Sequence, residues 1–361
     1  MDPIRLEVKS AQTTYPVVIG TGVLARLGTL LAAEGLDRDL HVVSCPPVWR
    51  KHGRRLRALV AERPVALIPD GERAKTLSTV ERIYNGLIKA RIDRGGVLIA
   101  VGGGVTGDVA GFAAATYLRG IRFVQVPTTL LAQVDSAIGG KVGVNLKAGK
   151  NLVGAFHPPA LVVCDPDVLG SLPAREFRAG LYEVIKYGVI ASRELFDRVD
   201  RDLPAILKRD PSVLTPLIAE CCRIKAAVVS ADERETGLRR TLNFGHTIGH
   251  ALESATSYRR FRHGEAIGFG MVAAARLSVS RGTLSAEDAG RLARLIDRLG
   301  ARPSVKDLRV KDALAAIGRD KKVVAGRLHF VLADGLGSTR IATDVTTEEL
   351  ASAMRDLGMR R

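Results

Sequence analysis

The chain has 361 residues, of which 46% are hydrophobic and 25% are charged. This length exceeds the size at which a single hydrophobic core usually stops growing, so we expect two domains. The composition excludes disorder of the whole chain, a collagen-like repeat and a disulfide-rich scaffold. The four cysteines match no zinc-ribbon spacing, and we expect all four to be reduced packing residues.

The net charge of +16 raises the question of an anionic partner. Aromatic residues make up only 4% of the chain and no RNA-binding or zinc-finger signature is present, so we expect no nucleic-acid partner. A small ligand with several negative charges fits the spread of basic residues at least as well. No apolar stretch is long enough to span a bilayer, and the first ten residues do not resemble a secretory leader. We therefore expect a cytoplasmic protein with no membrane partner.

The first half of the sequence alternates short β-rich runs with amphipathic helical stretches such as residues 76–91. This alternation predicts a largely parallel, Rossmann-like sheet covered by helices. Residues 4–8 and 15–19 predict an antiparallel addition to that sheet. The main β-rich runs are residues 40–44, 65–69, 97–101, 123–127 and 161–164.

The second half is predicted to be mainly helical. A late hairpin is the exception, at residues 328–332 and 339–342 with a turn at Asp334-Gly335. We place the boundary near residue 170, which gives an α/β domain at 1–170 and a helical domain at 171–361. The predicted helices are residues 174–200, 213–230, 241–256, 265–280 and 286–299.

The predicted strand at residues 97–101 runs directly into Gly102, Gly103 and Gly104, followed by Val105 and Asp108 at a helix start. Glycines at this place let backbone amides approach a pyrophosphate, and the helix N-terminus favours negative charge. A tight turn without a ligand is the alternative interpretation. Because the pattern is not G-x-G-x-x-G, it indicates only a turn suited to phosphate.

A polar segment follows the next predicted strand. Hydroxyls, lysines and amides at the carboxyl end of a parallel strand are typical of ligand sites in doubly wound sheets. We favour a binding segment over a solvated loop because three glycines lie among these small polar residues. The segment contains Thr128, Thr129, Asp135, Ser136, Lys141, Asn145, Lys147, Lys150 and Asn151.

Three histidines lie within 18 residues in the helical half: His246, His250 and His263. His246 and His250 are four residues apart and so share a helix face, as metal-binding pairs do. The acidic neighbours Glu183, Glu253 and Glu265 and these histidines together indicate a metal site, but spacing alone does not choose the ligands. Nearby cations favour a substrate with several negative charges, namely Lys186, Lys225, Arg239, Lys321 and Lys322.

Taken in order, seven motifs resemble the 3-dehydroquinate synthase family of sugar phosphate cyclases. They are GGGVTGD, VPTTLLAQVDSAIGGKVGVN, GKNLVGAF, GLYEVIKYG, LRRTLNFGHTIGHALE, HGEAIGFGM and DKKVVAG. The resemblance implies an NAD-binding α/β domain, a helical metal-binding domain and a homodimer. It also implies conversion of 3-deoxy-D-arabino-heptulosonate 7-phosphate, a small anionic sugar phosphate, to 3-dehydroquinate and phosphate in the shikimate pathway. The implied cofactors are NAD and one divalent metal, zinc or cobalt.

Carried over residue by residue, the resemblance implies metal ligation by Glu183, His246 and His263, and makes His250 a catalytic or substrate-contacting residue. Arg119 resembles an arginine that reaches the phosphate of the neighbouring subunit. The implied cofactor contacts are Glu72, Lys75, Gly103, Gly104, Val105, Asp108, Thr128, Thr129, Leu131, Asp135, Lys141, Lys150 and Asn151. The implied substrate or catalytic residues are Asp135, Lys141, Asn151, Lys186, Lys225, Glu235, Arg239, Asn243, His250, Lys321 and Lys322.

The chain departs from the family where relatives often bind the adenosine. Ser44-Cys45-Pro46-Pro47 stands where relatives often have an acidic or amide residue, and Val168 and Ser171 replace the more usual aromatic residue and threonine. The reaction implied by the resemblance is transient oxidation by NAD, phosphate elimination, reduction, ring opening and aldol closure. Two alternatives remain: a cyclase that makes a cyclitol, and a metal-dependent polyol dehydrogenase of the same fold. Arg239 and Asn243 are four residues apart, so we expect them on one helical face, at the start of the segment that carries His246 and His250, where all four can line one cavity. This pair favours a substrate carboxylate.

Overall fold

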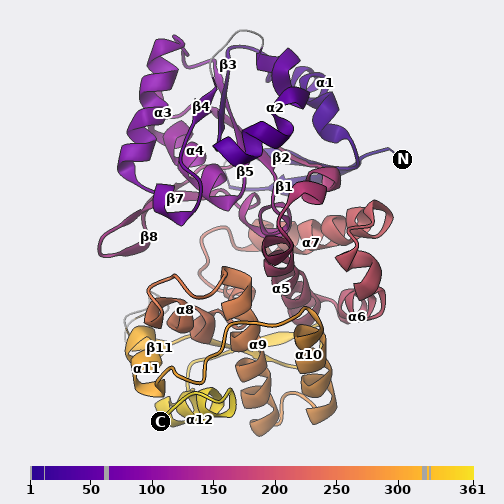
Figure 1. The fold of residues 1–361 in the computed structure, drawn as a ribbon, viewed down its shortest axis with the longest axis vertical. Coiled ribbons are helices and arrows are strands. Elements are labelled where there is room, and N and C mark those ends of the chain that lie inside the picture. Colours follow the sequence, from indigo (N-terminus) through magenta and orange to yellow (C-terminus); the bar gives the residue numbers. More distant parts are fainter. Residues whose placement is uncertain (1, 12, 61–64, 319–322, 325–326) are drawn as a thin grey trace. The chain divides into compact units, whose positions relative to one another are not determined.

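The computed structural model describes residues 2–11, 13–60, 65–318, 323–324 and 327–361. The chain, traced in Figure 1, divides into two compact units. The first unit contains Met1–Pro173 and Lys208–Glu233, and the second contains Ala174–Leu207 and Arg234–Arg361. The second unit therefore begins close to the boundary expected at residue 170, but one later segment belongs to the first unit.

A seven-stranded sheet forms the centre of the first unit, in the order β1-β2-β9-β6-β5-β3-β4. Its outer pair β1 and β2 is antiparallel, and all its other described neighbours are parallel. The predicted parallel α/β half with an antiparallel addition is thus confirmed. The strands are β1 (Ile4–Lys9), β2 (Thr14–Ile19), β3 (Leu40–Ser44), β4 (Ala66–Leu67), β5 (Val97–Gly102), β6 (Arg122–Pro127) and β9 (Leu161–Cys164).

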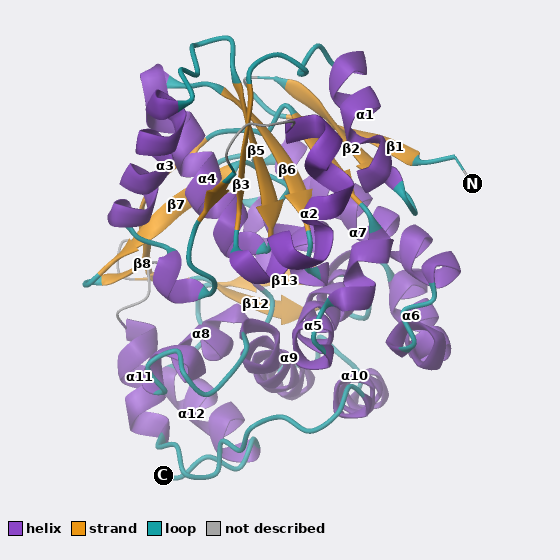
Figure 2. Cartoon of the chain, turned by 45° about the horizontal axis from the view of Figure 1, so that its top comes forward, coloured by secondary structure: helices purple, strands orange, loops and turns teal. Residues whose placement is uncertain are grey.

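Helices cover the sheet, as Figure 2 shows. Val43, Leu98 and Ala100 point into a core shared with α3 and α4, while Val42 and Ile99, which point to the other face, are buried as well. Buried strands of this kind need a cover on both faces. The helical segments of the first unit are η1 (Val23–Arg26), α1 (Leu27–Ala33), α2 (Pro46–Val60), η2 (Glu72–Ala74), α3 (Leu77–Lys89), α4 (Gly104–Thr116), η3 (Tyr117–Arg119), the π-helical turn η4 (Ala132–Ser136), η5 (Pro166–Ser171) and α7 (Pro211–Ala231).

Part of the polar segment predicted from the sequence forms a β-hairpin that the sequence did not predict. Strands β7 (Lys141–Leu146) and β8 (Gly149–Phe156) pair antiparallel. A Cβ atom at Gly143 would lie 2.5 Å from the carbonyl oxygen of Val153, so the two strands can approach only because glycine stands there. The same glycines hide the strand pattern in the sequence.

The second unit is mainly helical, as predicted, with a hairpin near the predicted place. The expected helix at 174–200 is two helices separated at Ser192, and the expected helix at 241–256 is interrupted at Gly245, whose φ is 77°. The elements are α5 (Ala174–Ala191), α6 (Arg193–Leu207), η6 (Leu238–Asn243), α8 (His246–Ala255), α9 (His263–Ser280), α10 (Ala286–Arg298), α11 (Val310–Gly318), β10 (Val323–Val324), β11 (Arg327–Leu328), β12 (Phe330–Ala333), β13 (Thr339–Ala342) and α12 (Thr347–Asp356).

Helix α7 follows two helices of the second unit in the chain, yet it packs against β1 and η4 of the first unit. Its side chains Cys221, Cys222 and Ile218 are fully buried. The sequence pattern grouped α7 with its neighbours because periodicity identifies a helix but not its packing partner. Among the described helices, none combines the length and the apolar character that a membrane span needs.

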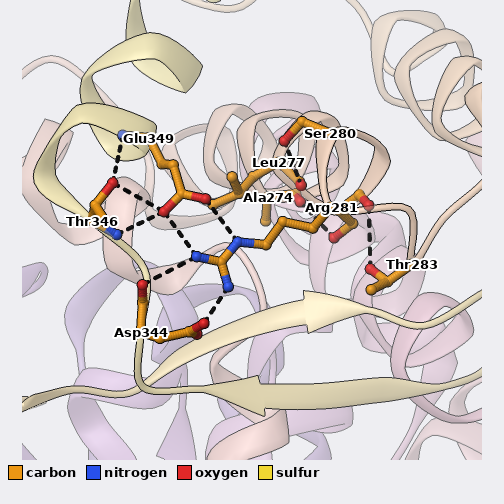
Figure 3. A network of polar contacts seen from close by, with 9 residues as sticks. Ala274, Leu277, Ser280, Arg281, Thr283, Asp344, Thr346 and Glu349 are labelled. Carbon is orange, nitrogen blue, oxygen red and sulfur yellow. Dashed lines mark hydrogen bonds and ion pairs between the residues drawn. The ribbon is translucent and has the colours of Figure 1, made fainter.

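One arginine joins the end of α9 to the start of α12. Figure 3 shows the guanidinium of Arg281 between the carboxylates of Glu349 and Asp344. Its Nε lies 2.8 Å from Oε1 of Glu349, and its Nη2 lies 2.8 Å from Oε2 of the same carboxylate. Its Nη1 lies 2.8 Å from Asp344 Oδ1. Glu349 also accepts a hydrogen bond of 2.7 Å from the backbone N–H of Thr346, which caps α12. These contacts, of which the hydrogen bonds from Arg281 have the largest effect, lower the pKa of Glu349 from 4.5 to about 2.

We expect Glu349→Gln to lower the free energy of unfolding at pH 7 by about 1–2 kcal/mol, because the amide keeps the size of the side chain but loses its charge. A carboxyl with a depressed pKa stabilises the fold above its unfolded value and loses that effect as the pH falls through its folded value. The difference between variant and wild type should therefore shrink between pH 4.5 and pH 2. Urea unfolding at pH 7 and at lower pH measures it.

Glu348→Gln is the matched control, because that side chain lies on the same turn and is 80% exposed. It should change the unfolding free energy little at either pH. An equal loss in Glu349→Gln at both pH values would contradict a role for the carboxylate charge.

Candidate active site

Three helices of the second unit direct nitrogen and oxygen donors at one point. His246 begins α8, His263 begins α9, and Glu183 lies in the middle of α5. The Nε2 atoms of His246 and His263 lie 3.6 and 3.4 Å from the same atom, Oε1 of Glu183. The three residues that the family resemblance implies as metal ligands are thus brought together, although they come from positions up to 80 residues apart.

The other ring nitrogen of each histidine, Nδ1, also has a hydrogen-bond partner. Nδ1 of His246 lies 3.1 Å from the carbonyl oxygen of Phe244, and Nδ1 of His263 lies 3.2 Å from Oε2 of Glu253. When Nδ1 donates its hydrogen, the lone pair of Nε2 faces Glu183. This is the arrangement in which histidine ligates a metal through Nε2.

His250 lies one helical turn after His246, with its ring centroid 5.3 Å from that of His246 and 5.8 Å from that of His263. Nitrogens of the three rings lie within 4.8 Å of one another. The distances therefore fit two ligand sets, one with Glu183 and one with His250. The sequence left this choice open, and the ligand set remains a prediction.

Close helix packing makes the convergence possible. A Cβ atom at Gly264 would collide with the carbonyl oxygen of Ala179, so the first turn of α9 touches the backbone of α5 one turn before Glu183. A Cβ at Gly249 would lie 2.7 Å from Cδ1 of Ile267, which brings α8 equally close to α9. Glycine is needed here for close approach rather than for an unusual φ.

The charges around Glu183 compensate for its burial. The side chain is completely buried, Oε1 accepts no hydrogen bond from the described residues, and Oε2 lies 2.5 Å from the ammonium of Lys186. Burial raises the pKa of Glu183, but Lys186 and His263 outweigh that effect and lower it to about 2. Burial lowers the pKa of His263, whereas the carboxylates of Glu253 and Glu183 raise it to about 10. A buried carboxylate oxygen that faces two imidazoles fits a divalent cation.

The segment before α8 carries three further predicted site residues. Arg239 and Asn243 lie in the 3₁₀ helix η6, and Asn243 donates a hydrogen bond of 2.5 Å to Oε1 of Glu235. Our expectation that Arg239 and Asn243 share one α-helical face is wrong, because a 3₁₀ helix has three residues per turn and residues four apart in it do not share a face. Arg239 is nevertheless 97% buried. Lys321 and Lys322 lie outside the described residues.

In the first unit, predicted residues gather at the carboxyl ends of β5 and β6. Gly103 caps α4, and Gly104, Val105 and Asp108 lie in its first two turns. A Cβ at Gly103 would lie 3.0 Å from Thr129 Cγ2, and one at Gly104 would lie 2.9 Å from Ser136 Oγ. The hydroxyls of Thr128 and Ser136 are buried and have no hydrogen-bond partner among the described residues. This turn beside orphaned hydroxyls fits a phosphate-bearing ligand. Leu131 follows in the same segment.

Lys75 connects three parts of the first unit. The Lys75 side chain is 6% exposed, and its ammonium contacts Asp108 of α4 and Asn151 of β8. Burial raises the pKa of Asp108, and Lys75 opposes that rise. Nearby, Glu72 Oε1 lies 2.8 Å from Asn145 Nδ2 and 3.4 Å from Lys150 Nζ. The structure thus brings these predicted cofactor residues together on the hairpin side of α4.

Lys225 of α7 meets Asp135 of η4. Its ammonium donates to the Asp135 carbonyl oxygen at 2.5 Å and to Oδ1 at 2.6 Å. The two residues are 90 positions apart, and the placement of α7 in the first unit explains the contact. Lys141, at the start of β7, is exposed. π-Helical turns such as η4 occur often at functional sites.

Arg119 is exposed in η3, which follows α4. Its φ is 71° and that of Leu118 is 49°. Two consecutive positive φ values at non-glycine residues store backbone strain, which structures tolerate mainly where the conformation has a use.

Sequence reasoning missed one residue that organises the first-unit site. Gln133 is fully buried, and its Nε2 donates to the carbonyl oxygens of Pro127 at 3.1 Å and Asp165 at 2.9 Å. It thereby ties together the ends of β6 and β9, two residues before Asp135. No sequence signal indicated this role, because only the fold brings those strand ends together.

Comparisons with known proteins agree with this architecture. Residues 65–179 match the 3-dehydroquinate synthase N-terminal family and residues 180–323 match the 3-dehydroquinate synthase C-terminal family. A 3-dehydroquinate synthase from Gloeobacter violaceus is 48% identical over 361 aligned residues, which cover 98% of this chain and 99% of that protein.

Two solved structures are also similar. The 2-epi-5-epi-valiolone synthase ValA from Streptomyces hygroscopicus, with NAD⁺ and Zn²⁺ bound, has a TM-score of 0.86 at 29% identity, covering 97% of this chain and 98% of that one. A 2-deoxy-scyllo-inosose synthase complexed with carbaglucose-6-phosphate, NAD⁺ and Co²⁺ has a TM-score of 0.85 at 27% identity, covering 98% and 99%. On the matches to both of its halves and on the identity over nearly its full length, this chain belongs to the 3-dehydroquinate synthase family.

Proposed function

We propose that this chain converts 3-deoxy-D-arabino-heptulosonate 7-phosphate to 3-dehydroquinate and phosphate, with NAD and one divalent metal ion, zinc or cobalt, as cofactors. Family membership at 48% identity to a 3-dehydroquinate synthase supports this reaction over that of the cyclases at 27–29% identity. The biosynthetic role of the family also supports a cytoplasmic location.

The observation that carries the proposal is the convergence of Glu183, His246 and His263 on one point. We infer that these three residues hold the metal, since an oxygen and two nitrogens form an open three-ligand set. When bound, the metal would polarise hydroxyl oxygens of the substrate, and NAD would accept and return a hydride.

The first-unit residues support the dinucleotide. Gly103 and Gly104 let Thr129 and Ser136 pack closely against the start of α4, whose N-terminus would favour a pyrophosphate, and the hydroxyls of Thr128 and Ser136 lack other partners among the described residues. Lys75 is held by its contacts with Asp108 and Asn151. Such preorganisation reduces the entropy lost on binding.

The remaining residues would bind and orient an anionic sugar phosphate. Lys186 is buried beside Glu183, where its ammonium would contact substrate oxygens near the metal. Arg239 would pair with the carboxylate, and Asn243 would act with Glu235, to which it is hydrogen-bonded.

His250, one turn after His246, would hold or move a proton. Lys225 with Asp135 and the exposed Lys141 would contact the ligands from the first unit. Lys321 and Lys322, which belong to the same family motif, complete the proposed set.

The reaction can be tested by incubating the chain with the heptulosonate phosphate, a catalytic amount of NAD and Zn²⁺ or Co²⁺. We expect phosphate release over many turnovers per NAD without net NADH, because the hydride returns to the substrate. His263→Ala should lose both bound metal and turnover. Accumulation of NADH would instead identify a polyol dehydrogenase, and full activity after complete removal of metal would contradict the metal site.

Arg239 provides a test of substrate class. If its buried guanidinium binds the substrate carboxylate, Arg239→Ala should cost about 3–5 kcal/mol in transition-state binding, or roughly two to three and a half decades in kcat/KM. Arg239→Lys should rescue only part of this loss because an ammonium lacks the two-pronged geometry. Arg240→Lys is the control, since among the described residues the contact of the Arg240 Nε is with a backbone carbonyl oxygen, that of Glu235, at 3.3 Å.

A heptulose 7-phosphate without the carboxylate distinguishes the proposed reaction from that of a cyclitol-forming cyclase. Wild type should prefer the carboxylate substrate strongly, and Arg239→Ala should lose that preference. Similar kcat/KM values of wild type for both substrates would favour the cyclitol-forming alternative.

We further propose a homodimer in which Arg119 reaches the substrate phosphate bound by the neighbouring subunit. Its exposure and its strained backbone support this role. The first unit also exposes large apolar side chains, as surfaces that meet a partner do. These are Leu67, Leu77, Ile88, Leu118, Leu146, Leu152 and Phe156.

Hybrid dimers test the shared site. Arg119→Ala and Lys186→Ala subunits should each be inactive, and mixing them should restore activity, because one of the two sites in each hybrid then has both wild-type residues. Mixing Glu183→Ala with Lys186→Ala is the control and should restore nothing, since both residues lie in α5 of the same subunit. Failure of the first mixture despite demonstrated subunit exchange would contradict the proposal.

A further inference from the structure

Glu253 is a buried carboxylate with no role in the proposed reaction. Its side chain is 7% exposed, and its Oε2 lies 3.2 Å from Nδ1 of His263. A buried carboxylate is costly unless a partner compensates its charge. A carboxylate placed on the ring of a proposed metal ligand therefore calls for an explanation.

The helix geometry gives Glu253 a defined place. His246, His250 and Glu253 stand at positions i, i+4 and i+7 of α8, so they form one stripe along that helix. His263 is the first residue of α9, the helix against which α8 packs through Gly249. Glu253, at the C-terminal end of this stripe, thus reaches Nδ1 of His263.

The two proposed histidine ligands are held in different ways. A backbone carbonyl accepts from Nδ1 of His246, whereas a carboxylate accepts from Nδ1 of His263. Both contacts leave Nε2 facing Glu183 Oε1. A carboxylate also makes the imidazole a stronger electron donor and adds a negative charge near the cation, which a carbonyl does not.

We propose that Glu253 is a positioning residue for the metal site: by accepting the Nδ1 hydrogen of His263, it fixes the ring so that Nε2 ligates the divalent cation. This inference rests on the proposed function, because it takes His263 as a ligand. Glu253 itself touches neither the metal nor the substrate.

The experiment measures metal affinity directly, by competition of Zn²⁺ or Co²⁺ between the purified chain and a chromophoric chelator. Glu253→Gln should weaken binding about 10- to 100-fold, because the amide keeps the size but loses the charge and the fixed acceptor. The visible spectrum of the Co²⁺-loaded variant should change as well, since the ring is held less firmly.

Glu265→Gln is the matched control. Glu265 is also buried, lies in the first turn of α9, and binds Arg175 and the backbone N–H of Arg262 rather than a histidine ring. We expect it to lower the unfolding temperature with little change in metal affinity. Equal losses of affinity in both variants would show that loosening α9 is sufficient, and would overturn the proposal.

A measurement on the wild type does not depend on the folding of any variant. In the Zn²⁺-loaded chain with ¹⁵N-labelled histidine, His263 should show a protonated Nδ1 and a metal-bound Nε2. Metal bound through Nδ1, or an affinity of Glu253→Gln within twofold of wild type, would overturn the positioning role and leave the proposed function standing. A wild type that binds no divalent metal would overturn both.

Discussion

The structure of the second unit depends on the cost of burying one carboxylate. Glu183 has no exposed surface, and an ionised carboxylate in that position must be compensated by nearby positive or hydrogen-bonding groups. Lys186 compensates from the next turn of α5, and two imidazoles approach the other oxygen. The glycines at 249 and 264 are needed because a side chain at 249 would push α8 away from α9, and one at 264 would push α9 away from α5. Ligand chemistry and helix packing thus impose one constraint on the sequence.

The first unit also buries charged groups, here the side chains of two lysines. Lys75 and Lys225 are both nearly buried, and each is held by an acidic partner, Asp108 and Asp135. An ammonium on a four-carbon stem loses much rotational freedom when it is fixed, so holding it in advance lowers the entropy lost when an anion binds.

The sequence predicted the order of a parallel α/β half and a helical half, because periods of two and near four residues are strong local signals. It also predicted a metal site among the histidines, since His246 and His250 share one helical face. It did not predict the packing of α7 on the first unit, the hairpin at β7 and β8, or the turn at Gly245 that separates η6 from α8. Those features depend on which surfaces meet. The same limit applies to Gln133, whose two acceptors lie on strand ends that only the folded sheet brings together.

Helix α7 explains why residues that are close in sequence belong to different units. Lys225 packs with the first unit, while Glu235, ten positions later, belongs to the second. The chain therefore leaves the first unit after Pro173, returns for α7 and leaves again after Glu233, so that each unit is built from segments distant in sequence. In such a topology, a residue's position in the chain does not predict the unit in which it packs. Asp135 and Lys225 pair across 90 positions, because α7 packs against β1 and η4 and carries the lysine with it.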